Sequence, residues 1–172
     1  MNLNYQNLLP ADFSSDSRVW IYQSNRPFSL TETPAIEAMM KNFVDEWMSH
    51  GAKVKGSAHL FFDQFIILIA DEKATGVSGC STDSSVRMIK EIEKRFGVDM
   101  FDRTTLAFVV EDKVQLLPMS QVQYAFDNGF MNSDTLYFNN LVQTKEELEK
   151  SWIIPVKDSW LVYKVSFQNT VS

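Results

Sequence analysis

The run from Phe65 to Ala70 is apolar at every position and is the longest such run in the chain. Crossing a bilayer takes about 20 apolar residues, so this run is far too short for a transmembrane helix. A short apolar run without alternation is typical of a β-strand that is covered on both faces. The sequence therefore predicts a buried strand here and no transmembrane segment.

Regular segments precede this strand. Val19 to Gln23 is strand-like, and apolar residues then recur at helical spacing to about His50, where Gly51 would end the helix. This helix could begin at the capping box of Ser29 to Glu32 or at the Thr33-Pro34 dipeptide. We therefore expect a strand followed by a first amphipathic helix.

A hairpin and a second helix come next. Lys53 to Phe61 is β-like, and the short link from Phe62 to Gln64 joins it to the buried run as an antiparallel hairpin. A second amphipathic pattern begins among Ser81 to Ser84 and ends at Gly97. Further segments follow: a hairpin of Thr105–Val110 and Val114–Leu117, a short helix after Ser120, a strand at Thr135–Phe138, a helix opened by the capping box Thr144–Glu147, and a terminal strand around Trp160–Phe167.

The order of these segments predicts an α+β fold. The first six elements follow the βαββαβ order of the ferredoxin-like split βαβ, to which the sequence adds an extra hairpin strand and a C-terminal helix-plus-strand extension. A chain of 172 residues that is 45% hydrophobic can bury one core, so we expect a single domain over residues 18–172. Residues 1–17 are polar and irregular and are expected to form an N-terminal arm.

Composition excludes several classes of function. The net charge of −6 would repel a phosphate backbone, and no basic stripe offsets it, so nucleic-acid binding is not expected. The single cysteine cannot form an internal disulfide, and the N-terminus lacks the basic and apolar blocks of a secretory signal. These features predict a cytoplasmic location.

Three familiar catalytic patterns are incomplete. The segment from Gly51 to Ser57 has the glycine spacing of a P-loop, but Ser57 stands where the phosphate-binding lysine belongs, which disfavours nucleotide hydrolysis. The segment from Gly76 to Cys80 lacks the last glycine of a nucleophile elbow. The two histidines, His50 and His59, form no clustered ligand pattern. We therefore expect no metal and no cofactor.

One segment could still carry chemistry, because it places hydroxyls and a thiol where the second helix begins and backbone amides lack intrahelical partners. Such an end attracts anions and favours a thiolate. Cys80 is accordingly a candidate nucleophile or redox-sensitive group. The same residue types also cap helices, and a free cysteine beside a strand is commonly buried, so a structural role stays open. The candidate ligand-binding residues here are Ser78, Cys80, Ser81, Thr82, Asp83 and Ser84.

Two arginines could extend this site. Arg26 follows the first strand and Arg103 precedes the fourth, so both could converge near one end of the sheet and share a pocket. Salt bridges with Asp71, Glu72 or Asp102 are the structural alternative. We include Arg26 and Arg103 among the candidate ligand-binding residues.

Several separated motifs carry a family resemblance: Ser17–Phe28, Trp47–Gly51, Gly79–Arg87, Phe138–Asn140 and Asp158–Trp160. Their order resembles that in a family of short bacterial proteins often labelled ABC transporter ATPase, from about residue 17 to residue 160. ATP hydrolysis would require a P-loop lysine, a metal-binding acidic strand end and a far longer domain. The resemblance therefore implies a stand-alone cytosolic protein, with an association to a transport system suggested only by the family label. The shared motifs contain Arg18, Arg26, His50, Cys80, Asp83, Arg87 and Trp160.

These observations predict a non-catalytic module that binds a small anion or a protein partner around Ser78 to Ser85 and Arg26. The alternative is a thiol-dependent enzyme or redox sensor that uses Cys80.

Overall fold

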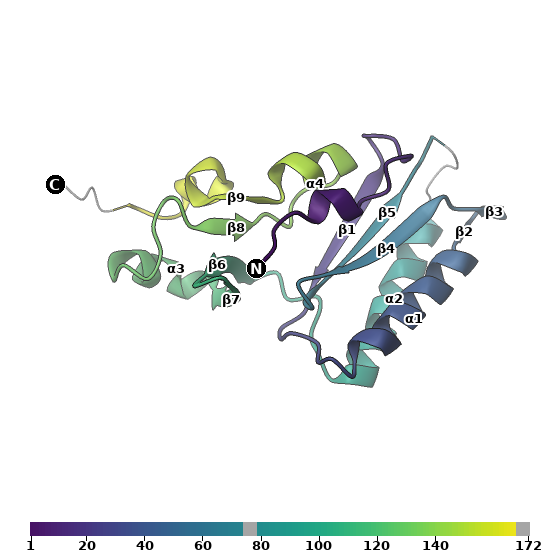
Figure 1. Ribbon diagram of the computed structural model, residues 1–172, viewed down its shortest axis with the longest axis horizontal. Helices are drawn as coiled ribbons and strands as arrows, with labels where there is room; N and C mark the ends of the chain where they lie inside the picture. Colours follow the sequence, from purple (N-terminus) through teal and green to yellow (C-terminus); the bar gives the residue numbers. More distant parts are fainter. Residues whose placement is uncertain (74–78, 168–172) are drawn as a thin grey trace. The chain divides into compact units, whose positions relative to one another are not determined.

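The computed structural model describes residues 1–73 and 79–167, and for residues 79–81 we describe only the backbone (Figure 1). It is an α+β structure in which the described strand pairs are all antiparallel. The chain divides into two compact units. The larger unit holds Asn2–Asp102 and Val142–Glu149, and the smaller unit holds Met1, Arg103–Leu141 and Lys150–Ser172. No helix in the described ranges is long and apolar enough to span a membrane.

The larger unit is built on a three-stranded antiparallel sheet in the order β1-β5-β4, formed by Arg18–Gln23, Phe65–Ala70 and Gly56–Phe61. Helices α1 (Thr33–Glu46) and α2 (Gly79–Phe96) cover one face of this sheet (Figure 1). Their apolar residues form one core with alternate residues of β5, namely Ile66, Leu68 and Ala70. The predicted strand, helix, hairpin and second helix are thereby confirmed.

The opposite face of the sheet is covered by the N-terminal segment and the start of α4 (Lys145–Ser151). A 3-10 helix, η1, spans Tyr5–Leu8. The Tyr5 ring packs edge-on against Phe61, and its hydroxyl donates a hydrogen bond to the Leu148 carbonyl. All residues of β5 are therefore buried, which confirms the predicted strand covered on both faces.

The predicted end of the first helix is wrong. Helix α1 ends at Glu46, and the next residue, Trp47, is extended and buries its ring. The chain then forms a small hairpin of β2 (Met48–Ser49) and β3 (Ala52–Lys53), in which Gly51 has a φ of 79°. Gly51 thus serves a hairpin turn and not a helix end, because burial of the Trp47 indole requires the chain to leave the helix one turn earlier.

The strand order differs from the predicted ferredoxin-like core. The β1-α1-β4-β5-α2 succession is present, but the next strand, β6, pairs with β7 and β8 in another sheet and not with β1. The outer edge of β1 is taken by the segment before α4, where the Val19 amide donates to the Gln143 carbonyl at 2.9 Å and Arg18 forms a β-bridge with Thr144. A fourth strand beside β1 is therefore excluded by the chain itself.

The smaller unit contains a four-stranded antiparallel sheet in the order β7-β6-β8-β9. Helix α3 (Met119–Asp127) and two 3-10 helices, η2 (Val156–Asp158) and η3 (Trp160–Tyr163), pack with it around a core centred on Phe108 and Val122. The strands are β6 Thr105–Val110, β7 Lys113–Pro118, β8 Leu136–Phe138 and β9 Ile153–Pro155.

The predicted terminal strand around Trp160–Phe167 is wrong, because this segment begins as η3. The Ser159 hydroxyl accepts a hydrogen bond from the Leu161 amide at 3.2 Å and donates one to the Val156 carbonyl at 2.8 Å. These capping contacts favour a helical turn, although the apolar residues alone resemble a strand. The short strand β9 was not predicted.

The end of α2 and the start of α4 lie where the local sequence signals placed them. Gly97, with a φ of 63°, ends α2 as predicted. At the predicted start of α4, the Thr144 hydroxyl accepts a hydrogen bond from the Glu147 amide at 3.2 Å. Helix α2 begins at Gly79, slightly before the predicted range.

The ring of Trp47 packs so closely on Gly56 that a side chain at position 56 should destabilise the protein. A Cβ atom at Gly56 would lie 2.5 Å from Cε3 of the buried Trp47 ring. Gly56→Ala should therefore lower the free energy of unfolding by about 1–3 kcal/mol through overpacking. Urea denaturation measures the loss, which should shrink in a Trp47→Phe background because phenylalanine lacks the indole ring system. An equal loss in both backgrounds would contradict this contact.

Candidate functional site

The segment predicted as a ligand site lies at the start of α2, and the structure describes only part of it. Ser78 lies outside the described residues, as do the side chains of Cys80 and Ser81. Asp83 is exposed, and Ser84 accepts a hydrogen bond from Arg87 at 3.1 Å. The buried Ser85 hydroxyl donates to the Thr82 carbonyl at 2.7 Å. The Ser85 hydroxyl also lies 3.3 Å from that of Tyr22 in β1, so the described polar contacts of this turn hold the helix and join it to the sheet. Ligand binding there stays a prediction.

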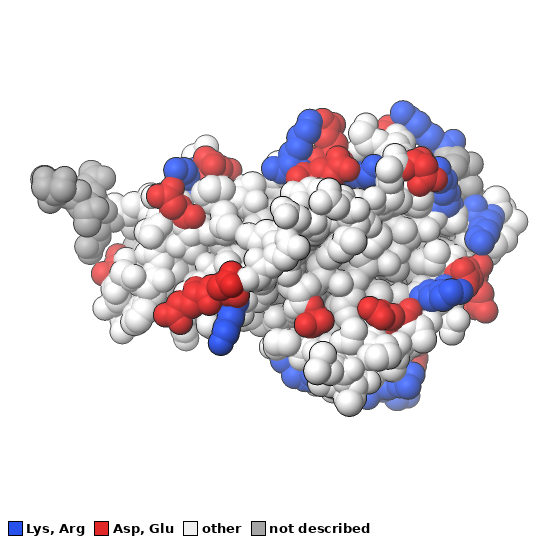
Figure 2. All heavy atoms as spheres, viewed as in Figure 1, with Lys and Arg blue, Asp and Glu red and all other residues white. Residues whose placement is uncertain are grey.

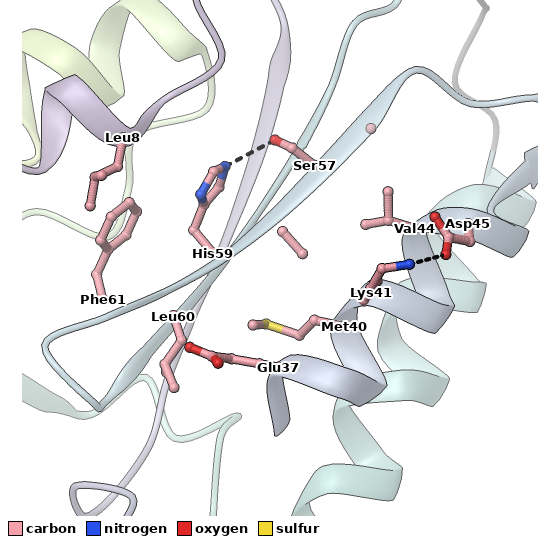
Figure 3. Close-up of a pocket in the computed structure, with 12 residues that line it drawn as sticks. Leu8, Glu37, Met40, Lys41, Val44, Asp45, Ser57, His59, Leu60 and Phe61 are labelled. Atoms are coloured by element: carbon pink, nitrogen blue, oxygen red, sulfur yellow. Dashed lines mark hydrogen bonds and ion pairs between the residues drawn. The ribbon is translucent and has the colours of Figure 1, made fainter. Parts of the chain in front are cut away.

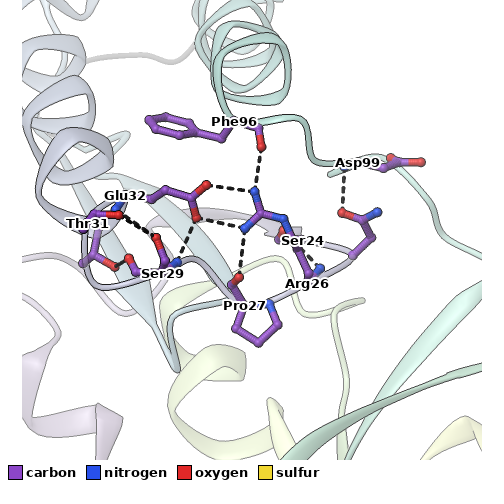
Figure 4. A network of polar contacts seen from close by, with 10 residues as sticks. Ser24, Arg26, Pro27, Ser29, Thr31, Glu32, Phe96 and Asp99 are labelled. Atoms are coloured by element: carbon purple, nitrogen blue, oxygen red, sulfur yellow. Dashed lines mark hydrogen bonds and ion pairs between the residues drawn. The ribbon is translucent and has the colours of Figure 1, made fainter.

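Arg26 is engaged by its own chain at the other end of α2. Its guanidinium donates two hydrogen bonds to the Glu32 carboxylate, both at 2.9 Å, and a third to the Phe96 carbonyl at 2.6 Å (Figure 4). An 18-residue helix is about 27 Å long, so Arg26 lies far from Thr82 to Ser84. The structure does not bring Arg26 and the start of α2 together.

The contacts of Arg26 also fix the loop before α1. The hydrogen bonds from Arg26, with a further one from the Ser29 amide, lower the pKa of Glu32 to about 2. Beside them, Asn25 and Asp99 exchange hydrogen bonds, which join the same loop to the chain after α2 (Figure 4). Arg26 therefore ties two helices and a loop together.

Arg103 is exposed and belongs to the smaller unit, whereas Arg26 belongs to the larger one. The pocket predicted between the two arginines is thus not a feature of either unit. Of the carboxylates predicted as their structural partners, Asp71 is buried and lies 3.7 Å from Lys55.

The larger unit has a groove along the outer edge of β4, with a volume of about 540 Å³ (Figure 3). Every residue of β4 lines it. Helix α1 forms one wall, and the side chain of Leu8 from η1 stands at the opposite wall. The residues contributed by α1 are Glu37, Met40, Lys41, Val44 and Asp45.

The edge of β4 that faces this groove carries backbone groups that no described strand pairs. The Asp71 amide donates to the Lys55 carbonyl at 2.8 Å, which makes this a hydrogen-bonded pair in the register of β4 with β5. Pairs alternate along an antiparallel ladder, so the amides and carbonyls of Ser57, His59 and Phe61 point toward β5. Those of Gly56, Ala58 and Leu60 then point outward into the groove.

The side chains of β4 divide between the two faces of the sheet. Ala58 and Leu60 face α1, where Met40 and Val44 give the groove an apolar wall and the Lys41–Asp45 ion pair, at 2.9 Å, lies at its rim (Figure 3). Charged side chains are sparse over β4 and gather along its margin in Figure 2. The strand itself contains no charged residue.

On the other face, His59 lies between Ser57 and Phe61. Its ring stacks on Phe61 at a centroid distance of 5.5 Å, and its Nε2 lies 3.1 Å from the Ser57 hydroxyl. Burial lowers the pKa of His59, so the imidazole is neutral at pH 7. A serine beside a neutral histidine suggests acyl transfer, but that chemistry needs a third group to orient the base. Within the described ranges no hydrogen bond orients the ring through Nδ1; the one contact of the ring nitrogens there is that of Nε2 with Ser57.

The groove was not found from the sequence, although a weak signal exists. Gly56 to Phe61 lacks the lysine, proline and acidic residues that usually protect an edge strand. Recognising that signal requires knowing that β4 lies at an edge, which follows only from the strand order.

The described residues contain no group of three or more histidine, cysteine or acidic side chains placed to hold a metal ion. No protein-family model, curated protein or solved structure matches the chain. The groove therefore has to be interpreted from its own geometry.

The contacts of Glu32 give a pH prediction. Its pKa is lowered in the folded state, so its contribution to stability is complete above the ordinary carboxyl range and is lost as the pH falls toward 2. Glu32→Gln should destabilise the protein at pH 7, and the difference from wild type should shrink between about pH 4.5 and pH 2. Denaturant unfolding across this range measures it. Glu46→Gln is the control, because Glu46 is an exposed carboxylate at the end of α1. A difference for Glu32→Gln that is independent of pH would contradict the assignment.

Proposed function

We propose that the protein is a non-catalytic binding module that accepts an extended segment of a protein at the outer edge of β4. The observation that carries this proposal is the row of outward-facing backbone groups at Gly56, Ala58 and Leu60, set along a groove of about 540 Å³. An added strand would pair with these groups and place its alternate side chains on the two faces of the sheet. Hydrogen bonds to the main chain supply affinity, and the flanking walls supply selectivity.

The two edge strands of the sheet, β1 and β4, differ in whether another described segment pairs with them, and this difference supports the proposal. Residues 143–144 occupy the edge of β1, whereas none of the described segments pairs with the edge of β4. Natural proteins usually protect an open edge with charge, proline or a bulge, because an unprotected edge pairs with other chains. An open and uncharged edge beside a groove therefore favours a binding role.

The walls of the groove suggest what the bound segment looks like. Side chains that point toward α1 meet Met40 and Val44, so small or medium apolar residues suit these positions. Side chains on the other face meet His59, Phe61 and Leu8, where neutral and aromatic residues pack well. A segment with alternating uncharged residues fits both faces.

We further propose that the larger unit is a variant of the ferredoxin-like fold. Its strand order, β1-β5-β4, and its two helices on one face match the first five elements of that core. The segment before α4 takes the place of the fourth strand beside β1, and β4 forms the opposite edge of the sheet.

A display selection tests the proposed function. Random ten-residue peptides are selected on the full chain, and a bound peptide should protect the Gly56, Ala58 and Leu60 amides from solvent exchange in NMR spectra. Ala58→Pro removes an outward amide without breaking the ladder to β5, so it should weaken binding at least about tenfold. Ala58→Thr keeps the amide and should bind like wild type. Peptides that bind with equal affinity to Ala58→Pro would contradict the proposal.

The start of α2 supports a second candidate function, which is a thiol enzyme or redox sensor. Cys80 occupies the first turn of α2, where the partial positive charge of a helix end favours a thiolate. The same helix end is the alternative place for a small anion. The resemblance to proteins labelled ABC transporter ATPase adds the proposal of an accessory role in the cytoplasm beside a transport system.

Alkylation of Cys80 distinguishes the two functions. If the protein is a binding module with an ordinary thiol, the alkylation rate of Cys80 should rise with pH around a pKa of about 8.5, or Cys80 should not react at all. The thiol alternative requires a pKa well below that value. Iodoacetamide labelling at several pH values, followed by mass spectrometry, measures this pKa, and the Cys80→Ser variant is the blank.

A further inference from the structure

We infer that the strand which occupies the β4 edge is β4 of a second copy of this chain, paired antiparallel about a two-fold axis with Ala58 opposite Ala58. This inference rests on the proposed function, because it names the segment that the edge accepts. It would join two three-stranded sheets into one continuous sheet and close both open edges at once.

The backbone pattern of β4 is compatible with self-pairing. Outward-facing groups must meet outward-facing groups, and Gly56, Ala58 and Leu60 are evenly spaced about Ala58. With Ala58 on the axis, Gly56 of each copy pairs with Leu60 of the other. This register uses all three outward positions and forms about six backbone hydrogen bonds.

The side chains are complementary in the same register. Leu60, the large residue of the α1 face, lies opposite Gly56, over which the chain packs the apolar ring of Trp47. On the other face Ser57 lies opposite His59, so a hydroxyl meets a neutral imidazole across the axis, as it already does within one strand at 3.1 Å. A register centred on His59 would instead place two imidazoles together.

Charge and exposure also favour a second copy. Because β4 carries no charge, the paired strands bring no like charges together. Of the charged residues that line the groove, Lys41 and Asp45 form an ion pair with each other, and Glu37 is the remaining one. Leu8 lines the groove with 66% of its surface exposed, and an added strand on that face would cover it. Pairing therefore removes an exposed leucine from water.

Analytical ultracentrifugation of the full chain tests this inference. Wild type should form a dimer whose dissociation constant rises at least about tenfold in Ala58→Pro, because two central hydrogen bonds are lost, and stays unchanged in Ala58→Thr. A wild-type chain that remains monomeric at about 0.5 mM, or a dimer unaffected by Ala58→Pro, would overturn the inference. The peptide selection above then decides separately whether the edge binds any strand.

Cysteine cross-linking tests the register without relying on the proline variant. In a Cys80→Ser background, Ala58→Cys should form an intermolecular disulfide on mild oxidation, since directly opposed residues lie about 5.5 Å apart. Leu60→Cys in the same background is the matched control and should not cross-link, because its own counterpart lies about four residues away, roughly 13 Å along the strand. Cross-linking through position 60 in preference to position 58 would overturn the proposed register.

Discussion

Burial of β5 on both faces and both sides is the constraint on which the larger unit depends. Phe65–Ala70 pairs with β1 on one side and β4 on the other, while α1 and α2 cover one face and η1 and α4 cover the opposite face. Because β5 is the central strand, its two neighbours, β1 and β4, are the edge strands of the sheet. Residues 143–144 cover the edge of β1, whereas no segment in residues 1–73 and 79–167 pairs with the edge of β4, and the proposed function follows from that difference.

Several polar side chains hold the fold together, and Arg26, a predicted ligand-binding residue, is one of them. Arg26 donates hydrogen bonds to Glu32 and to the Phe96 carbonyl, which connect the start of α1 to the end of α2. In the smaller unit, the Trp160 indole donates to the Tyr137 hydroxyl at 3.1 Å, and the Trp152 indole donates to Asn140 at 3.0 Å. Several motifs of the family resemblance therefore have structural tasks, and the proposed binding surface lies on a strand outside them.

Local features of the fold were predictable from the sequence, and long-range pairing was not. The buried run at Phe65–Ala70, the Thr144 capping box and the end of α2 at Gly97 depend on neighbouring residues, so their patterns identified them. Gly51 was misassigned because Trp47 leaves the helix to reach a distant core position. The sheet to which β6 belongs, and the contact of residues 143–144 with the edge of β1, depend on distant segments meeting, which no local pattern encodes.

Amide hydrogen exchange along β4 tests the central claim most directly. At the lowest workable protein concentration, the amides of Ser57, His59 and Phe61 should exchange slowly because they pair with β5, whereas those of Gly56, Ala58 and Leu60 should exchange fast. Raising the concentration, or adding a strand-forming peptide, should slow only the second set. Equal protection of both sets in the dilute protein would show that the edge is already covered and would contradict this account.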